Sequence, residues 1–223
     1  MTGGMAERGV GGGFARLPGF SLAVTVALVA VILGLGILIG IGLRPQPTGP
    51  FASCHPSAEL APRVYAGPPP MCIDPNAAYS AVIQTTQGNV TLSFPPQAAP
   101  VAVNNFIVLA LDGYYNGLPF FNIQSFAVQS GDPTGTGRGG PGYDLPSEPP
   151  IANDTWPTGS VGMSLFPDGT VSGGQFFITR AAWPSGPPTI SYDHFANVTA
   201  GIDVLSQLTA SDHIISVTVR KGA

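Results

Sequence analysis

Uninterrupted, alternating and helically spaced hydrophobic positions occupy different parts of this 223-residue chain. The first pattern is an apolar run from Phe20 to Leu43, and no charged side chain occurs between Leu17 and Leu43. A helix of this length spans the hydrocarbon core of a bilayer, which is about 30 Å thick. The run also lacks the polar face that a helix on the surface of a soluble domain presents. It predicts one transmembrane helix over residues 20–43.

Alternating hydrophobic positions begin near residue 78 and indicate strands. Two β-rich runs, residues 81–86 and 89–94, are separated by Gln87 and Gly88, and apolar and polar residues alternate in the second run. Together they predict a hairpin with one buried face. A half-buried strand is predicted near the C-terminus, where polar residues alternate with Ile215, Val217 and Val219.

Helical spacing appears in two places. Pro100 suits a first helical turn, and hydrophobic residues then recur three or four positions apart until Gly113 ends the pattern. A second, shorter helix is predicted by the spacing of Ile202, Leu205 and Leu208. Strands therefore dominate, and the predicted fold class is mainly β.

Composition divides the chain into four segments. Residues 1–19 are rich in glycine and predict a short tail before the membrane anchor at residues 20–43. Residues 44–77 are rich in proline, which predicts an extended linker. Residues 78–223 contain the predicted strands and helices and are long enough for one globular domain.

Charged residues around the apolar run indicate its orientation. Arg8 and Arg16 precede the run and Arg44 follows it, a bias that predicts a cytoplasmic N-terminal tail. The protein is then a single-pass protein of the cell membrane with an extracytoplasmic C-terminal domain. Cleavage of the anchor, or a lipid attached to Cys54, are alternatives that the sequence leaves open. After residue 44 there are five basic and eleven acidic side chains, which argues against binding to nucleic acid.

Cys54 and Cys72 are the only cysteines, and both lie in the proline-rich segment. On the outer side of a membrane such a pair is expected to form a disulfide, which would stabilise the fold by about 3 kcal/mol through closing a short loop. The sequence contains neither a CxxC nor a CxxCH motif. No metal, haem or other cofactor is therefore expected.

The most specific motifs lie between residues 79 and 220. Residues 126–143 read FAVQSGDPTGTGRGGPGY, an apolar strand that runs into a glycine-rich loop, and residues 175–179 read QFFIT. These segments resemble the cyclophilin family, and other motifs occur in that family's order: APVAVNNF at 99–106, GYYNG at 113–117, GSVGM at 159–163 and GIDVL at 201–205. The resemblance implies an eight-stranded antiparallel β-barrel capped by two α-helices, here in a membrane-anchored, bacterial-like form.

The activity that this resemblance implies is peptidyl-prolyl cis-trans isomerisation. Twisting an X–Pro amide meets a resonance barrier of about 18–20 kcal/mol. An enzyme can lower this barrier by holding the proline ring in an apolar pocket while a donor bonds the proline nitrogen as it loses conjugation. The substrate-binding residues that the family pattern implies are Phe126, Gln129, Gln175, Phe177, Trp183 and Tyr192. Without that pattern, Phe126 and Phe177 would be interpreted as ordinary core aromatics.

One position departs from the family pattern. Cyclophilins have Phe-His-Arg where this chain reads Phe120-Phe121-Asn122, so Asn122 stands where the family has its catalytic arginine. The segment from Phe120 to Gln129 is also one residue shorter than the usual pattern, which leaves a second alignment open. The resemblance therefore implies an isomerase of extracytoplasmic proteins with reduced activity.

Two other functions remain open at this point. A catalytically weak module could bind proline-containing polypeptides as a tethered chaperone, because a pocket can bind without the arginine. A structural domain at the cell surface would result if Trp183 or Phe121 filled the pocket. The expected partners are proline-containing polypeptides and the lipid bilayer around residues 20–43, and the protein is expected to be a monomer.

Overall fold

The computed structural model describes residues 48–96, 98–148, 155–184 and 191–222. The predicted tail and membrane anchor, residues 1–43, lie outside the described residues. Within the described ranges, no helix is long and apolar enough to cross a membrane.

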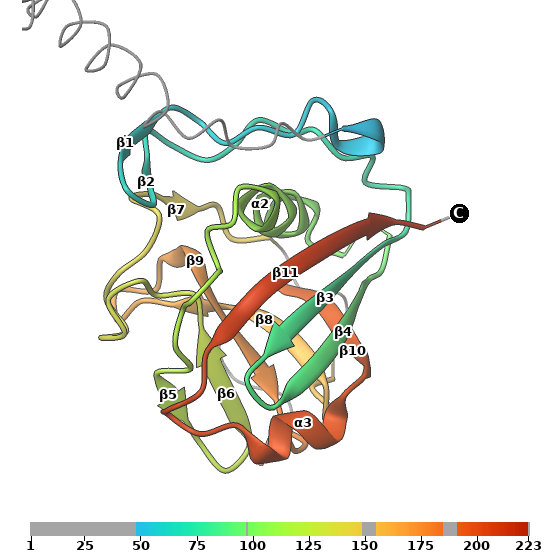
Figure 1. The fold of residues 1–223 in the computed structure, drawn as a ribbon, viewed down its shortest axis with the longest axis vertical. Coiled ribbons are helices and arrows are strands. Elements are labelled where there is room, and N and C mark those ends of the chain that lie inside the picture. The colour runs from blue at the N-terminus through green and yellow to red at the C-terminus, as the bar shows by residue number, and fades with distance from the viewer. Residues whose placement is uncertain (1–47, 97, 149–154, 185–190, 223) are drawn as a thin grey trace, which may run out of the picture. The chain divides into compact units, whose positions relative to one another are not determined.

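Nine strands form one antiparallel sheet that curls around the main core (Figure 1). Neighbouring strands follow the order β11 (Ile214–Lys221), β3 (Tyr79–Thr85), β4 (Gly88–Phe94), β10 (His194–Ala200), β8 (Ser160–Leu165), β9 (Val171–Thr179), β6 (Ala127–Ser130) and β5 (Asn122–Ile123). A ninth strand, β7 (Asp144–Leu145), pairs with β9.

The sheet differs from the expected eight-stranded barrel in two respects. The chain after the glycine-rich loop adds the short strand β7 along β9, which raises the count to nine. The two ends of the sheet, β5 and β11, are not paired with each other as strands within the described residues, although an isolated bridge joins Pro119 to His213. Around this bridge, the Phe120 N–H donates to the Asp212 carbonyl at 3.1 Å and the Ile214 N–H donates to the Leu118 carbonyl at 2.9 Å, so the two edges meet over this short stretch.

The predicted hairpin is confirmed by β3 and β4, which pair along their whole length with alternating burial. The predicted C-terminal strand is confirmed by β11, but its side chains are not arranged as expected. Ile215 is 45 % exposed rather than half-buried. The register with β3 shifts between Ile214 and Ser216, and this bulge turns Ile215 toward solvent.

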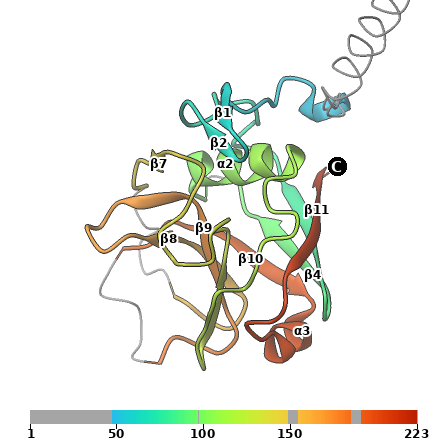
Figure 2. The same ribbon diagram turned by 60° about the vertical axis from the view of Figure 1, so that its left-hand side comes forward.

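Both predicted helices are present, α2 (Pro100–Leu111) and α3 (Ile202–Gln207). They lie at opposite ends of the curled sheet (Figures 1 and 2). All residues from Ala102 to Ala110 in α2 are buried, which is more than the one apolar face that the spacing predicts. A helix that is buried all round needs a cover on its outer side. Residues 48–77 provide that cover.

We call residues 48–77 the strap. Composition predicts an extended linker here, whereas the strap contains η1 (Gly49–Phe51) and a hairpin of β1 (Glu59–Ala61) and β2 (Val64–Tyr65). Four of its side chains are buried in the main core: Phe51, Cys54, Tyr65 and Ile73. Burial of these four side chains stabilises the packed strap over the extended conformation that its proline content predicts.

Covalent and polar contacts also fix the strap. Cys54 and Cys72, the predicted pair, are joined by a disulfide. The buried Asn104 side chain of α2 accepts a hydrogen bond from the Cys72 N–H at 2.9 Å and donates one to the Pro70 carbonyl at 3.1 Å. The strap is therefore held to α2 by backbone recognition as well as by apolar packing.

Candidate functional site

Four neighbouring strands each place one residue in a row on the outer face of the sheet. Asn122 on β5 pairs with Gln129 on β6, Gln129 pairs with Phe177 on β9, and Phe177 pairs with Gly162 on β8. Paired residues point to the same face of a sheet, and successive residues alternate. The ring of Phe176 therefore enters the main core, whereas Phe177 belongs to a separate aromatic cluster.

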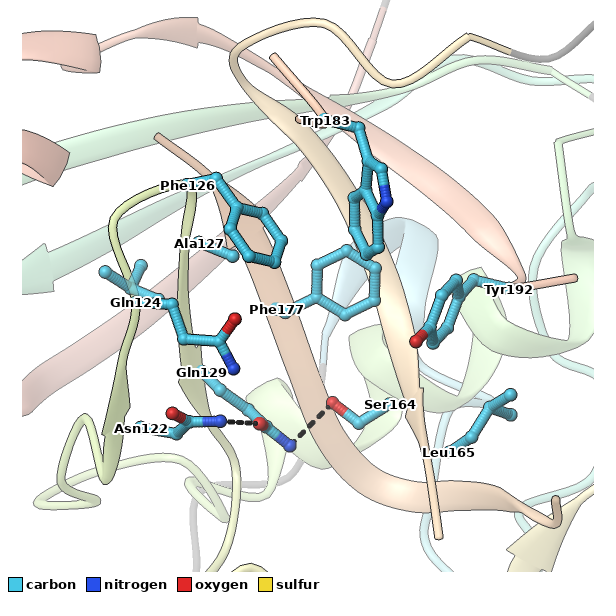
Figure 3. Close-up of a pocket in the computed structure, with 11 residues that line it drawn as sticks. Asn122, Gln124, Phe126, Ala127, Gln129, Ser164, Leu165, Phe177, Trp183 and Tyr192 are labelled. Carbon is cyan, nitrogen blue, oxygen red and sulfur yellow. Dashed lines mark hydrogen bonds between the residues drawn. The ribbon is translucent and has the colours of Figure 1, made fainter. Parts of the chain in front are cut away.

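A cavity of about 170 Å³ lies over this row (Figure 3). Asn122 lines it, and so do five of the six predicted substrate-binding residues: Phe126, Gln129, Phe177, Trp183 and Tyr192. The sixth, Gln175, does not line the cavity but bonds to Gln129. Trp183 forms a wall without filling the space, and Phe121 is not among the lining residues. A pocket filled by either side chain is therefore not what the structure shows.

Aromatic rings form one end of the cavity. The centroid of the Phe126 ring lies 5.0 Å from that of Trp183, and the Phe177 centroid lies 5.0 Å from that of Tyr192, both pairs in edge-to-face geometry. Trp156 stacks behind Phe177 at 5.3 Å. This end can hold an apolar ring through area burial and edge contacts.

Sequence reasoning missed Trp156, which packs against Phe177 in the aromatic cluster. It comes from the loop before β8 and is only 5 % exposed. A Cβ atom at Gly162 would lie 2.5 Å from Trp156 Cη2 and 2.7 Å from Phe177 Cζ, closer than real side chains approach. Glycine at position 162 is therefore needed for the stack. The only signal in the sequence was this glycine between the buried residues of the GSVGM motif.

Side-chain amides form the other end of the cavity. Asn122 Nδ2 donates to Gln129 Oε1 at 3.0 Å, and Gln129 Nε2 donates to Ser164 Oγ at 2.9 Å (Figure 3). Gln129 Nε2 also donates to Gln175 Oε1 at 3.0 Å, and Gln175 Nε2 donates to the Gly139 carbonyl at 2.7 Å. The carbonyl can only accept, so it fixes the direction of every amide in this network. One N–H of Asn122 is consequently engaged by Gln129.

The glycine-rich loop that presents Gly139 is held by Asp132, which is fully buried. Its Oδ1 accepts from the N–H and hydroxyl of Thr134, and its Oδ2 accepts from four consecutive N–H groups, those of residues 136–139. Burial disfavours the charged carboxylate, but these hydrogen bonds outweigh burial and hold the pKa of Asp132 below its usual value. A side chain at Gly139 would collide with this carboxylate.

None of the described residues that line the cavity is charged. Arg180, which follows β9, donates its Nη2 to the Ser206 carbonyl at 2.6 Å. The side chain of Arg138 belongs to the glycine-rich loop and does not line the cavity. Burial raises the pKa of Tyr192, so its hydroxyl stays neutral at ordinary pH. The site can therefore hold an apolar ring beside uncharged hydrogen-bonding groups.

Residues 80–220 match the family model described as cyclophilin type peptidyl-prolyl cis-trans isomerase. The chain is 37% identical over 142 residues to a peptidyl-prolyl cis-trans isomerase of Helicobacter pylori, covering 61% of this chain and 84% of the relative. It is 34% identical over 140 residues to one from Synechococcus elongatus, covering 62% and 94%. A solved cyclophilin type isomerase from Cryptosporidium parvum matches with a TM-score of 0.57 and 25% identity, over 66% of this chain and 99% of that chain. The strap precedes the matched range.

Proposed function

Because the chain belongs to the cyclophilin-type peptidyl-prolyl cis-trans isomerase family, we propose that its cavity isomerises X–Pro bonds of extracytoplasmic proteins with reduced activity. The observation that carries this proposal is the cavity itself, in which an aromatic end adjoins a network of neutral amides. No charged donor stands among the described lining residues.

The aromatic end suits the proline ring. Phe177 forms the floor, and Phe126, Trp183 and Tyr192 form the walls. The amide end suits the peptide groups next to the ring, since Gln129 lies directly across from Phe177 in the sheet. The substrate class is therefore an extended polypeptide with an accessible proline, bound by ring burial and by hydrogen bonds to its backbone.

Reduced activity is proposed because Asn122 is a weak substitute for an arginine. It faces the cavity beside Gln129, as a donor at this position must, but its amide is neutral and one N–H is already engaged. A hydrogen bond to a charged group contributes about 1.5–3 kcal/mol, so its absence corresponds to roughly a tenfold to hundredfold lower rate.

The test uses the full chain and a short proline peptide. NMR measures the rate at which the cis and trans forms of the peptide exchange. Asn122→Arg is expected to raise the isomerisation rate at least tenfold with little change in peptide affinity. Asn76→Arg, at an exposed position in the strap, adds the same charge away from the cavity and is the matched control. A wild-type rate equal to that of an arginine-bearing cyclophilin, measured in parallel, would contradict reduced activity.

A second candidate function is a tethered chaperone that binds proline-containing segments without accelerating their isomerisation. The uncharged cavity favours it, because ring burial needs no charged donor. Peptide binding by the wild type with no rate above the uncatalysed one would support this candidate over the isomerase.

Extracytoplasmic action is proposed from the uncharged run at residues 20–43 and from the Cys54–Cys72 disulfide, since disulfides persist in oxidising compartments. We expect a single-pass monomer whose C-terminal domain is digested by protease added outside intact, wall-stripped cells. Digestion only after the membrane is permeabilised would place the domain in the cytoplasm and refute the proposal.

A further inference from the structure

Ser164 lies where the aromatic and amide ends of the cavity meet. Along β8, Val161 and Met163 are fully buried in the main core, whereas Gly162 pairs with Phe177 on the outer face of the sheet. The register with β9 shifts between Met163 and Leu165, and Ser164 at this shift also faces the cavity. Ser164 is only 4 % exposed, yet it lines the cavity. Figure 3 shows its hydroxyl oxygen between the amide of Gln129 and the ring of Tyr192.

The Ser164 hydroxyl accepts one hydrogen bond and retains a hydrogen to donate. Gln129 Nε2 donates to it at 2.9 Å. The direction of this bond is fixed by the Gly139 carbonyl, which accepts from Gln175 Nε2 and so leaves Gln175 Oε1 facing Gln129. Gln129 must therefore present its Nε2, which donates to both Gln175 and Ser164. A hydroxyl that accepts can still donate once. Within the described part of the chain, Ser164 Oγ donates to no acceptor.

The other described polar groups that line the cavity are Asn122, Gln124, Gln129 and Tyr192. Among the polar lining groups, only the Ser164 hydroxyl accepts a hydrogen bond from the amide network while it keeps a hydrogen to donate. One N–H of Asn122 is engaged by Gln129, and Gln129 directs its own amide hydrogens to Ser164 and Gln175. The hydroxyl of Ser164 is therefore the last member of a chain of donors that runs from Asn122 through Gln129. Each donor in such a chain polarises the next, so the bond from Gln129 makes the Ser164 hydroxyl a better donor.

We propose that the Ser164 hydroxyl donates the hydrogen bond to the proline nitrogen as the X–Pro amide twists. The inference rests on the isomerase function proposed above. The nitrogen has no available lone pair while the amide is planar and gains one as conjugation is lost. A bond to this lone pair exists only near the transition state, so it raises the rate without tightening substrate binding.

The test compares Ser164→Ala and Ser164→Thr in the full chain, with isomerisation rate, peptide affinity and unfolding measured for each. Removing one neutral hydrogen bond is expected to lower the bound-state rate about fivefold to tenfold with peptide affinity nearly unchanged, and Ser164→Thr should restore most of the rate. Ser160→Ala is the matched control. Ser160 is a buried serine on the same strand whose hydroxyl donates to the Pro157 carbonyl at 3.0 Å, outside the cavity.

Each outcome separates this proposal from the function on which it rests. An active wild type whose Ser164→Ala variant isomerises at the same rate overturns the role of Ser164 and leaves the isomerase function standing. A loss seen only as weaker peptide affinity overturns it as well, because Ser164 would then bind substrate without acting on the twist.

Tyr192→Phe removes the neighbouring hydroxyl, and a rate loss there with none in Ser164→Ala assigns the donor to Tyr192. A wild type with no activity overturns both proposals. Should Ser164→Ala not fold, Ser164→Cys keeps the volume with a weak donor and is expected to show the same rate loss.

Discussion

Asp132→Asn tests whether one buried carboxylate holds the glycine-rich loop and, through it, the cavity. The substitution preserves size and keeps one oxygen for Thr134. With that oxygen toward Thr134, the amide turns its NH2 group toward the four N–H groups of residues 136–139, from which Oδ2 accepts in the wild type. Donors would then face donors, and the loop must open to water or shift. Gly139, whose carbonyl orients Gln175, lies at the end of this loop.

The magnitude follows from the bonds that are lost. A hydrogen bond to a charged group contributes about 1.5–3 kcal/mol, and the four bonds to Oδ2 are shared and not additive. Taking one such bond as the minimum, Asp132→Asn should lower the free energy of unfolding by at least about 1.5–3 kcal/mol. Loss of the Gly139–Gln175 bond removes about 1 kcal/mol of support from the amide network, which corresponds to roughly fivefold weaker peptide binding.

The assay combines urea unfolding, hydrogen exchange of the amides at residues 136–139, and peptide binding. The pKa of Asp132 is lowered in the folded protein, so its contribution to stability is present above the unfolded value of 3.8 and is lost as pH falls through the folded pKa. The difference between wild type and Asp132→Asn should therefore narrow below about pH 4. Asp74→Asn is the charge-matched control, because Asp74 is exposed and its carboxylate accepts from the Asn76 N–H in a local turn.

The reasoning would be refuted by a variant that unfolds at the wild-type urea concentration and keeps amides 136–139 protected. In that case the glycine-rich loop would hold its shape without the carboxylate. Weaker peptide binding with unchanged loop protection would also contradict it, because the effect would not pass through Gly139.

Three further predictions concern the floor of the cavity, a buried carboxyl group and the strap. Phe177→Ala should lower the free energy of unfolding by about 3–5 kcal/mol and weaken peptide binding strongly, and a folded variant with wild-type affinity would exclude Phe177 as the floor. Burial, with a smaller effect from a neighbouring glutamate, raises the pKa of Asp193 to about 6. The contribution of the Asp193 carboxyl group to stability is therefore present below about pH 4 and is lost as pH rises through 6. The urea midpoint should change less with pH in this range in Asp193→Asn than in the wild type, and an equal change in both would contradict this prediction. Reduction of Cys54–Cys72 should cost about 3 kcal/mol and expose the strap amides to exchange, whereas equal midpoints with and without reductant would mean that burial alone holds the strap.

Local patterns in the sequence were sufficient for the elements, and the resemblance to a family supplied most of the site residues. Alternation predicted the hairpin of β3 and β4, and Pro100 with Gly113 marked the ends of the α2 pattern, because these signals act within a few residues. The family resemblance that the glycine-rich loop and the QFFIT motif carry implied five residues that line one cavity. The membrane anchor at residues 20–43 stays a prediction, since it lies outside the described residues.

Tertiary structure decided the roles that these patterns left open. Period two separates Phe176 from Phe177, but only the curvature of the sheet determines that the first ring enters the core and the second forms the cavity floor. No local signal places Trp156 behind Phe177, because their contact depends on the pairing of β8 with β9 and on the missing side chain of Gly162.

The same holds for the strap and for the amide network. Proline content predicted an extended segment, yet burial against α2 and the disulfide fold it, because a few long-range contacts outweigh the local average. The direction of the bonds from Asn122 to Gln129 is set by a backbone carbonyl at Gly139 in a different loop. Residue identity fixes which groups can donate, but what each donates to depends on strand register and on the path of that loop, which exist only in the folded chain.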